Sequence, residues 1–315
     1  MSARRKLATS VVVVAVLAAL FSSCLASDKP LVLRYDGTTY WLPNIFDYDG
    51  LSGLSGDRLR DRMDKDDWAI WAPIPYSPSG VRTAGQLRPL EAPSSRHWLG
   101  TDDRGRDVFA RLIHGTRATV ITACGAAALA LLVGLTLALL AAFVRRVDTA
   151  VIASCDVAAA MPAIVVVVAA QGLIGSASLL AAIVLIAIPR AADTARIARA
   201  GLHSALAAPF CDAARATGAT ESRVVLQHAL PHAVPQLAVA TALTAATAVL
   251  AEAALSFLGF GVQPPDASWG ELLKQASQND LRWWLAVPAG AAIAAVAAAL
   301  NALAQPAGGE SYRVL

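Results

Sequence analysis

Two histidines, His228 and His232, are the first residues in this sequence whose type and spacing could do chemistry. Four residues apart on a helix, their imidazoles would share one face, as the ligands of a zinc site do. Pro231 lies between them and is expected to interrupt the helix, and no Glu follows His228 as a zinc hydrolase pattern requires. We predict neither a metal site here nor a resident cofactor.

Asp156 and Glu252 are the carboxylates inside long apolar runs, and ionisable residues within a membrane are functional by default. Both lie near the expected ends of their runs, where water can reach them. Two roles stay open, structural hydrogen bonding and a place on a translocation path. No Ser/His/Asp or paired-carboxylate arrangement has the spacing of an active site, so an intramembrane hydrolase is set aside and the chain is not expected to be an enzyme.

The remaining reactive side chains give weaker signals. His97 and His114 are expected to be surface or packed histidines, with a role on a nickel path as the alternative. No CxxC spacing joins the cysteines, so we predict no disulfide or zinc framework and one free thiol in a polar loop, Cys211. The sequence has no G-x-x-x-x-G-K-[ST] phosphate loop, so this chain cannot bind ATP by that device.

The composition points to a membrane protein. Of the 315 residues, 56% are hydrophobic and 16% charged, the formal net charge is +3 and the mean hydropathy is +0.53. Near-continuous apolar runs of about 20 residues predict transmembrane helices and a chain that crosses the lipid membrane several times. The weak, scattered positive charge shows no basic stripe with interleaved aromatics, which argues against nucleic acid as a partner.

The first apolar run, Leu7–Ala26, follows three basic residues and has three possible interpretations. It could be a cleaved signal peptide, a lipoprotein signal that ends at Cys24, or a retained first span; its length favours retention. Later runs bring the predicted total to six spans, all rich in the small residues that let helices approach closely. These runs are Ala118–Val144, Ile152–Gln171, Ile174–Ile188, Val234–Phe260 and Leu285–Ala304.

Basic residues in the short loops set the predicted orientation. With the basic N-terminus in the cytoplasm, Arg145 and Arg146 and the arginines between spans four and five also fall inside. The polar segment 27–116, with its Pro, Gly and Asp clusters, then lies outside as short helices or strands. The loop 189–232 lies in the cytoplasm, and the protein is placed in the cytoplasmic membrane.

The sequence of the cytoplasmic loop 189–232 predicts a helix–turn–helix. Gly218 stands at a helix-stop position, and Pro231 and Pro235 are expected to mark the return to the membrane. An ordinary solvated connector is the alternative. The small residues Ala213 and Ala214 favour docking instead, because a solvated helix has no need for a smooth, flat face.

At the same loop the sequence resembles the EAA loop of permease subunits of binding-protein-dependent ABC importers. That motif runs Glu-Ala-Ala, three residues, Gly, and Pro thirteen positions further on. The chain departs from it with Asp in place of Glu, with Leu226 where an aromatic is common and with Ala229 where Ile is common. The matching residues are Asp212, Ala213, Ala214, Gly218, Leu230 and Pro231.

Further stretches narrow the resemblance to the second permease subunit of dipeptide, oligopeptide and nickel importers. They are HWLGTDDRGRDVFARLIHGTRATV (97–120), the segment from Asp156 through Met161-Pro162, and EAALSFLGFGVQPPDASWGELL (252–273). The long insert with PLVLRYDGTTYWLP is similar to the branch tied to oligopeptide and peptide-antibiotic uptake. The ending ALAQPAGGESYRVL departs from the family's usual charged tail.

The resemblance implies an all-α type I ABC importer permease with six transmembrane helices. Its segments would be 1–26 (cytoplasmic N-terminus and first helix), 27–116 (extracytoplasmic insert), 117–304 (five-helix core with coupling loop 189–232) and 305–315 (cytoplasmic tail). The implied partners are a second permease subunit, two ATP-binding subunits and an extracytoplasmic solute-binding protein. A self-sufficient secondary transporter or channel is the alternative, and the solute could be an oligopeptide, a dipeptide, nickel or a peptide antibiotic.

Overall fold

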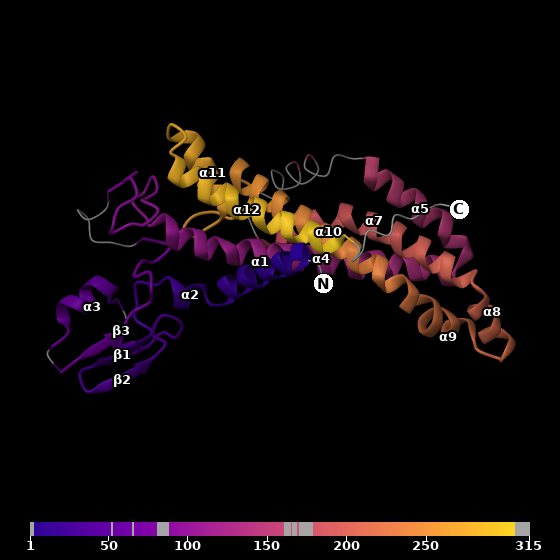
Figure 1. Cartoon of the computed structure of the whole chain (residues 1–315), viewed down its shortest axis with the longest axis horizontal. Coiled ribbons are helices and arrows are strands. Elements are labelled where there is room, and N and C mark those ends of the chain that lie inside the picture. The colour runs from indigo at the N-terminus through magenta and orange to yellow at the C-terminus, as the bar shows by residue number, and fades with distance from the viewer. Residues whose placement is uncertain are drawn as a thin grey trace. The chain divides into compact units, whose positions relative to one another are not determined.

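The computed structural model is mostly helical (Figure 1). It describes residues 3–51, 53–64, 66–80, 88–160, 165, 169 and 179–305. The long helices are α1 (Ala3–Leu20), α4 (Val108–Phe143), α5 (Arg145–Ala160), α7 (Leu179–Leu206), α10 (Leu230–Leu258) and α12 (Trp283–Ala304). Shorter helical elements are α2 (Ser22–Leu25), η1 (Asp49–Leu51), α3 (Gly56–Arg62), α8 (Pro209–Ala216), α9 (Glu221–Arg223), the π-helical turn η2 (Val224–Ala229) and α11 (Trp269–Gln278).

Three of the described helical stretches are long and apolar enough to cross a membrane. They are Val108–Phe143, Glu221–Leu258 and Trp283–Ala304, and each overlaps one of the predicted runs. The six-span prediction is therefore matched at three places. The first predicted run, Leu7–Ala26, falls on α1 and α2 and is not one of these three stretches, so its role as a span stays a prediction. The second half of the run Ile152–Gln171 and the start of Ile174–Ile188 lie outside the described residues, apart from 165 and 169.

Helix boundaries differ from the hydrophobic runs because helices continue into polar sequence. α4 begins at Val108, well before the predicted start at Ala118. α7 continues through Pro189 to Leu206, deep into what was expected to be loop. A hydrophobic run marks where a helix is apolar and says little about where its backbone hydrogen bonding stops.

The chain divides into two compact units. The first consists of Met1–Val12, Thr122–Ala251 and Val296–Leu315, and the second of Val13–Ile121 and Glu252–Ala295. Within the first unit, helices meet through small residues. A Cβ added at Gly134 would come within 2.7 Å of the Ala191 carbonyl oxygen, so α4 and α7 approach there to a distance that only glycine allows.

The second unit contains the polar insert, which holds a three-stranded sheet of order β2-β1-β3. The strands are β1 (Val32–Tyr35), β2 (Thr38–Trp41) and β3 (Trp68–Ile70), all antiparallel. Leu33 of β1 packs with Leu51 and Leu59 in a small core of their own. The predicted short helices and strands in this segment are confirmed.

Candidate functional site

The polar segment between α7 and α10 is a helical hairpin, residues 209–231. α8 begins with Pro209 and ends in a Schellman motif: Gly218 N–H donates to the Arg215 carbonyl at 2.9 Å, and Ala219 N–H to the Ala214 carbonyl at 3.1 Å. Gly218 has φ +89°, a left-handed conformation that suits glycine. The predicted helix stop at Gly218 is confirmed.

The small residues of α8 do not share one face. Ala213 and Ala216 are exposed, but Ala214 is buried and packs into a hydrophobic cluster with Leu202 and Val224. The prediction that Ala213 and Ala214 form one flat docking face is therefore wrong for Ala214, because adjacent residues on a helix point about 100° apart.

Cys211 also belongs to this cluster and is fully buried. The predicted free thiol is confirmed, but the predicted loop position is wrong, because Cys211 lies in helix α8. Because α8 packs its Cys211 side against α7 and η2, the thiol serves as a small apolar side chain.

Ion pairs connect α8 and α9 at the tip of the hairpin. Arg215 donates to Asp212 at 2.9 Å and to Glu221 at 3.0 Å, so one guanidinium joins α8 to α9. The bonds to Glu221 and Asp212 raise the pKa of Arg215. We call the two ion pairs of Arg215 the Arg215 clasp. Because Asp212 and Glu221 are exposed, the clasp orders the turn more than it stabilises the protein.

The helix continues through Pro231, contrary to the predicted interruption. The π-helical turn η2 precedes it, and Leu230 N–H donates to the Val225 carbonyl five residues back. This wider turn leads into the first residues of α10, where a proline is tolerated. Leu230 is half-buried against the cluster around Leu202, and Pro231 is exposed.

His228 lies in the hairpin, and His232 lies just beyond it in α10. The His232 ring stacks on Phe210 with centroids 4.5 Å apart. Within the described part of the chain, no group of three or more His, Cys, Asp or Glu side chains could hold a metal ion. The structure gives His232 a packing partner in place of a ligand role.

Asp156 lies on the exposed side of α5, and access of water to its carboxylate stays a prediction. Its carboxylate is 3.3 Å from Arg196 of α7, which also pairs with Asp193 at 2.7 Å. A second pair joins the same helices, because Arg199 donates to both oxygens of Asp148. These pairs fit the structural alternative, and a translocation-path role for Asp156 stays a prediction.

Glu252 is buried, with 1% of its surface exposed, so the predicted access of water is wrong for this residue. Its carboxylate accepts hydrogen bonds from Ser256 at 2.8 Å, from Ser268 at 3.0 Å and from Thr119 at 3.2 Å. The loop before α11 brings Ser268 to the Glu252 carboxylate of α10. These contacts join α4, α10 and that loop, which fits the hydrogen-bonding role; a translocation-path role stays a prediction.

Sequence reasoning missed a buried ion-pair network around Arg111, which we call the Arg111 hub. Arg111 is fully buried, 2.8 Å from Glu271 and 3.4 Å from Asp102. Arg106 in turn donates to Asp102 at 2.7 Å. The guanidinium of Arg111 also donates to the carbonyl oxygens of Pro78 and Asp266. Arg111 therefore joins the loops that contain Pro78, Asp102 and Asp266.

A sequence signal for this network existed. In TDDRGRD (residues 101–107), Asp102 lies four residues before Arg106, and these two side chains form an ion pair in the structure. Asp103 lies at the edge of the network, where burial, together with the charges of Asp102 and Glu271, raises its pKa.

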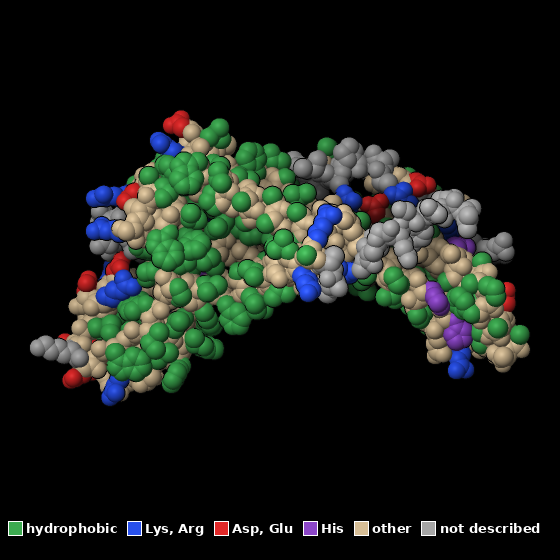
Figure 2. All heavy atoms as spheres, in the orientation of Figure 1, with side chains coloured by type: hydrophobic (Ala, Val, Ile, Leu, Met, Phe, Trp, Pro, Cys, Tyr) green, Lys and Arg blue, Asp and Glu red, His purple; other side chains and the backbone are tan. Residues whose placement is uncertain are grey.

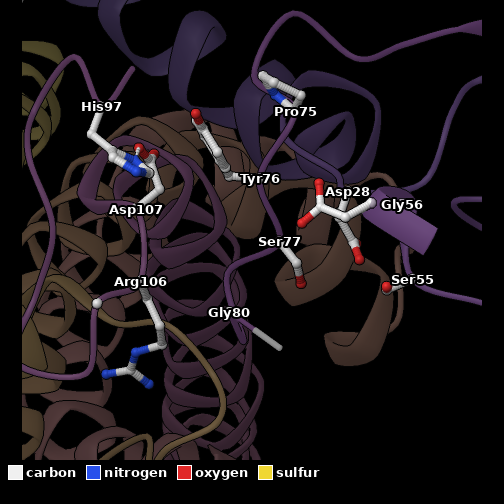
Figure 3. Close-up of a pocket in the computed structure, with 12 residues that line it drawn as sticks. Asp28, Ser55, Gly56, Pro75, Tyr76, Ser77, Gly80, His97, Arg106 and Asp107 are labelled. Carbon is white, nitrogen blue, oxygen red and sulfur yellow. Dashed lines mark hydrogen bonds and ion pairs between the residues drawn. The ribbon is translucent and has the colours of Figure 1, made fainter. Parts of the chain in front are cut away.

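The two other histidines, His97 and His114, lie in the second unit, and His97 lines a pocket beside the hub. His97 and Asp107 point toward one another in Figure 3, and His97 Nδ1 is 2.8 Å from the Asp107 carboxylate. Tyr76 stacks on the His97 ring with centroids 4.6 Å apart. His114 contacts the Ala26 carbonyl oxygen at 2.8 Å. Both histidines are packed, in line with the preferred prediction.

Apolar helices of membrane-spanning length, with a polar hairpin between two of them, define a helical membrane protein. Residues 121–305 match the family model described as binding-protein-dependent transport system inner membrane component. The chain belongs to this family. It is a permease component of a transport system, a class distinct from enzymes.

Named relatives agree with this assignment. The chain is 36% identical over 211 residues to the dipeptide transport system permease protein of Alkalihalophilus pseudofirmus, covering 67% of this chain and 69% of the relative. It is 32% identical over 216 residues to the glutathione transport system permease protein of Pectobacterium atrosepticum, covering 67% and 70%. The family resemblance predicted from the sequence is confirmed.

Proposed function

We propose that this chain is one permease subunit of an ABC importer for peptides or similar small solutes in the cytoplasmic membrane. The names of the relatives, dipeptide and glutathione permeases, support a short peptide as the solute class. A second permease subunit would complete the pore, two ATP-binding subunits would supply the energy, and an extracytoplasmic protein would deliver the solute. This chain would contribute six spans with the N-terminus in the cytoplasm.

In this proposal the hairpin 209–231 is the coupling element that docks on an ATP-binding subunit. The residues it would present are those exposed at its tip, Asp212, Ala213 and Ala216. Gly218 and the Arg215 clasp would hold the tip in shape for docking. Leu230 and Pro231 would join the hairpin to the span that follows.

Packing behind the tip would carry the movement of the hairpin into the membrane. One buried cluster joins Ala138 of α4, Leu202 of α7, Ala214 of α8 and Leu237 of α10. Close-packed interiors deform little, so a push on α8 would move these helix segments together. This shared cluster is the observation that carries the proposal, because a solvated connector would not bury its own residues among several spans.

Substitution at Ala213 tests the docking role. Ala213→Arg adds a long charged side chain to the exposed face without entering the core, so the protein should reach the membrane at normal levels. Uptake of a labelled dipeptide and retention of the ATP-binding subunit in a pull-down should both be lost. Ala213→Ser, which keeps the side chain small, is the matched control and should behave like the wild type. Normal uptake and retention in Ala213→Arg would contradict the docking role.

Cysteine labelling tests the orientation. In a cysteine-free background, Thr38→Cys in the insert should react with a membrane-impermeant maleimide on intact spheroplasts. Ser222→Cys in the hairpin should react only after permeabilisation. Both positions are exposed. The reversed result would refute the proposed topology. Solute uptake by this chain alone, reconstituted in vesicles without ATP, would instead favour a secondary transporter.

A further inference from the structure

An apolar patch lies on the polar insert of the second unit, next to the end of α1. Its large side chains are exposed, Trp41 by 66%, Phe46 by 57% and Ile45 by 52%. Phe21 and Leu25, at the end of α1 and in α2, are exposed as well. Figure 2 shows hydrophobic side chains gathered on the visible face of this part of the molecule, where Figure 1 labels β2. Exposed apolar side chains in such a group mark a surface that contacts something other than water.

Hydrogen bonds fix the patch to the helix that leads out of the predicted first span. Asn44 Nδ2 donates to the Ser23 carbonyl at 2.7 Å, so the turn that carries Ile45 and Phe46 is attached to α2. The amides of Ile45 and Phe46 both donate to the Leu42 carbonyl at 2.9 Å, which makes this turn compact. The turn that carries Ile45 and Phe46 is therefore held against α2, which directly follows the end of α1.

The sheet extends the same apolar surface. Trp41 lies across from Val32 in β2 and β1, and Val32 lies across from Ile70 in β3. Cross-strand partners share one face of a sheet, and this face is opposite the one that buries Leu33. The row Trp41, Val32, Ile70 is thus an apolar row on this face that begins at Trp41 of the patch, and Arg34 with its partners Thr39 and Trp68 forms the next row.

We propose that the patch of Phe21, Leu25, Trp41, Ile45 and Phe46 rests in the headgroup layer of the membrane, on the leaflet where α1 emerges. The inference rests on the proposed function, because it takes α1 as a span and the insert as extracytoplasmic. The insert would then be held with its sheet at the bilayer surface.

Continuity with the span favours lipid over a protein partner as the occupant. Only six residues separate Leu25 from Val32, so the sheet starts within about 25 Å of the end of α2. Phe21 and Leu25 are the outward continuation of the exposed apolar side chains Leu17 and Leu20 of α1, which face lipid if α1 spans. Tryptophan at the end of a span is typical of the membrane interface.

Lipid quenching tests the proposal in the full complex reconstituted in phosphatidylcholine vesicles. An environment-sensitive fluorophore is attached to Phe46→Cys, with the native cysteines replaced. Ile45→Cys is a second labelled variant, in case the first folds poorly. Thr38→Cys, at the far end of β2, is the matched control. Lipids that carry a spin label near the headgroup should quench the Phe46 and Ile45 positions about threefold more than the Thr38 position.

Equal quenching at all three positions would overturn the proposal. Absence of lipid quenching together with a blue shift on adding the solute-binding protein would also overturn it, and would assign the patch to a protein interface. The impermeant maleimide reaction at Thr38→Cys on spheroplasts reports the side of the membrane separately. A reversed side would refute the proposed topology, while quenching at Phe46 still decides whether the patch touches lipid.

Discussion

The hairpin 209–231 and the Arg111 hub hold their charged residues in opposite ways. At the tip of the hairpin, Arg215 and its two carboxylates are partly or fully exposed. In the hub, Arg111 and Asp102 have no exposed side-chain surface and Arg106 has 3%. The core of the hairpin is apolar and made of small residues, whereas the hub is a polar core.

This difference separates a surface for binding from a structural support. Exposed ion pairs are screened by water, so their loss costs little stability and the tip can vary its chemistry to suit a partner. A buried guanidinium that loses its carboxylate stays desolvated and unpaired, which is costly. We therefore expect substitutions in the hub to lower stability, and substitutions at the exposed tip to affect coupling with little change in stability.

The largest expected effect is at Arg111. Arg111→Ala removes the cation nearest to Glu271 and leaves Glu271 and Asp102 buried with Arg106 as their remaining cation, so it should destabilise the second unit by about 3–5 kcal/mol. Thermal unfolding of the purified protein in detergent, followed by light scattering and tryptophan fluorescence, measures the change. Arg104→Ala, at an exposed arginine of the same segment, is the control and should stay within about 0.5 kcal/mol of the wild type. Equal stability of the two variants would remove the distinction between hub and surface.

Glu252 comes next. Glu252→Ala removes the acceptor for Thr119, Ser256 and Ser268, and buried hydroxyls without partners should cost about 1–3 kcal/mol. Glu252→Gln keeps an acceptor oxygen and should recover part of the loss in the same unfolding assay. If Glu252→Gln abolished dipeptide uptake at unchanged stability, the carboxylate would have a role in transport and not only in structure.

Gly218 should show a smaller effect on stability. A β-branched residue at φ +89° is strained, and Gly218→Val should cost about 1–2 kcal/mol. Gly218→Asn, which adopts the left-handed region more readily, is the matched control and should lose less. No neighbouring atom lies within 4 Å of the position that a Cβ would occupy, so the strain is in the backbone and not in a clash. Equal unfolding temperatures for the two variants would contradict this assignment.

The smallest effect is the pH dependence of the pair between Asp148 and Arg199. The hydrogen bond from Arg199 lowers the pKa of Asp148 below its unfolded value of about 3.9. The pair therefore contributes stability above that pH, and the contribution is lost as the pH falls through the lower folded pKa. Unfolding temperatures of the wild type and Asp148→Asn should differ slightly at pH 6, and the difference should shrink as the pH falls below about 3.9. A difference that stayed constant on acidification would rule out ionisation as its cause.

The sequence by itself determined the class of protein and the position of the hairpin. Apolar runs long enough to span a membrane leave few alternatives to helices, because unpaired backbone groups are too costly in lipid. Gly218 marked the helix stop correctly, since its conformation depends on local chemistry alone. The motif around Asp212 identified the family from residue types and spacing, which survive without knowledge of the packing.

Only the tertiary structure decided which side chains are buried. Ala213 and Ala214 are identical in type and adjacent in sequence, yet one is exposed and the other packs into the core. Glu252 was expected at a solvent-accessible helix end, but its carboxylate is buried and accepts hydrogen bonds from hydroxyls of α4 and of the loop before α11. Arg111 joins residues more than 150 positions away, such as Asp266 and Glu271. Burial and long-range pairing depend on which elements meet in space, and no local pattern in the sequence encodes that.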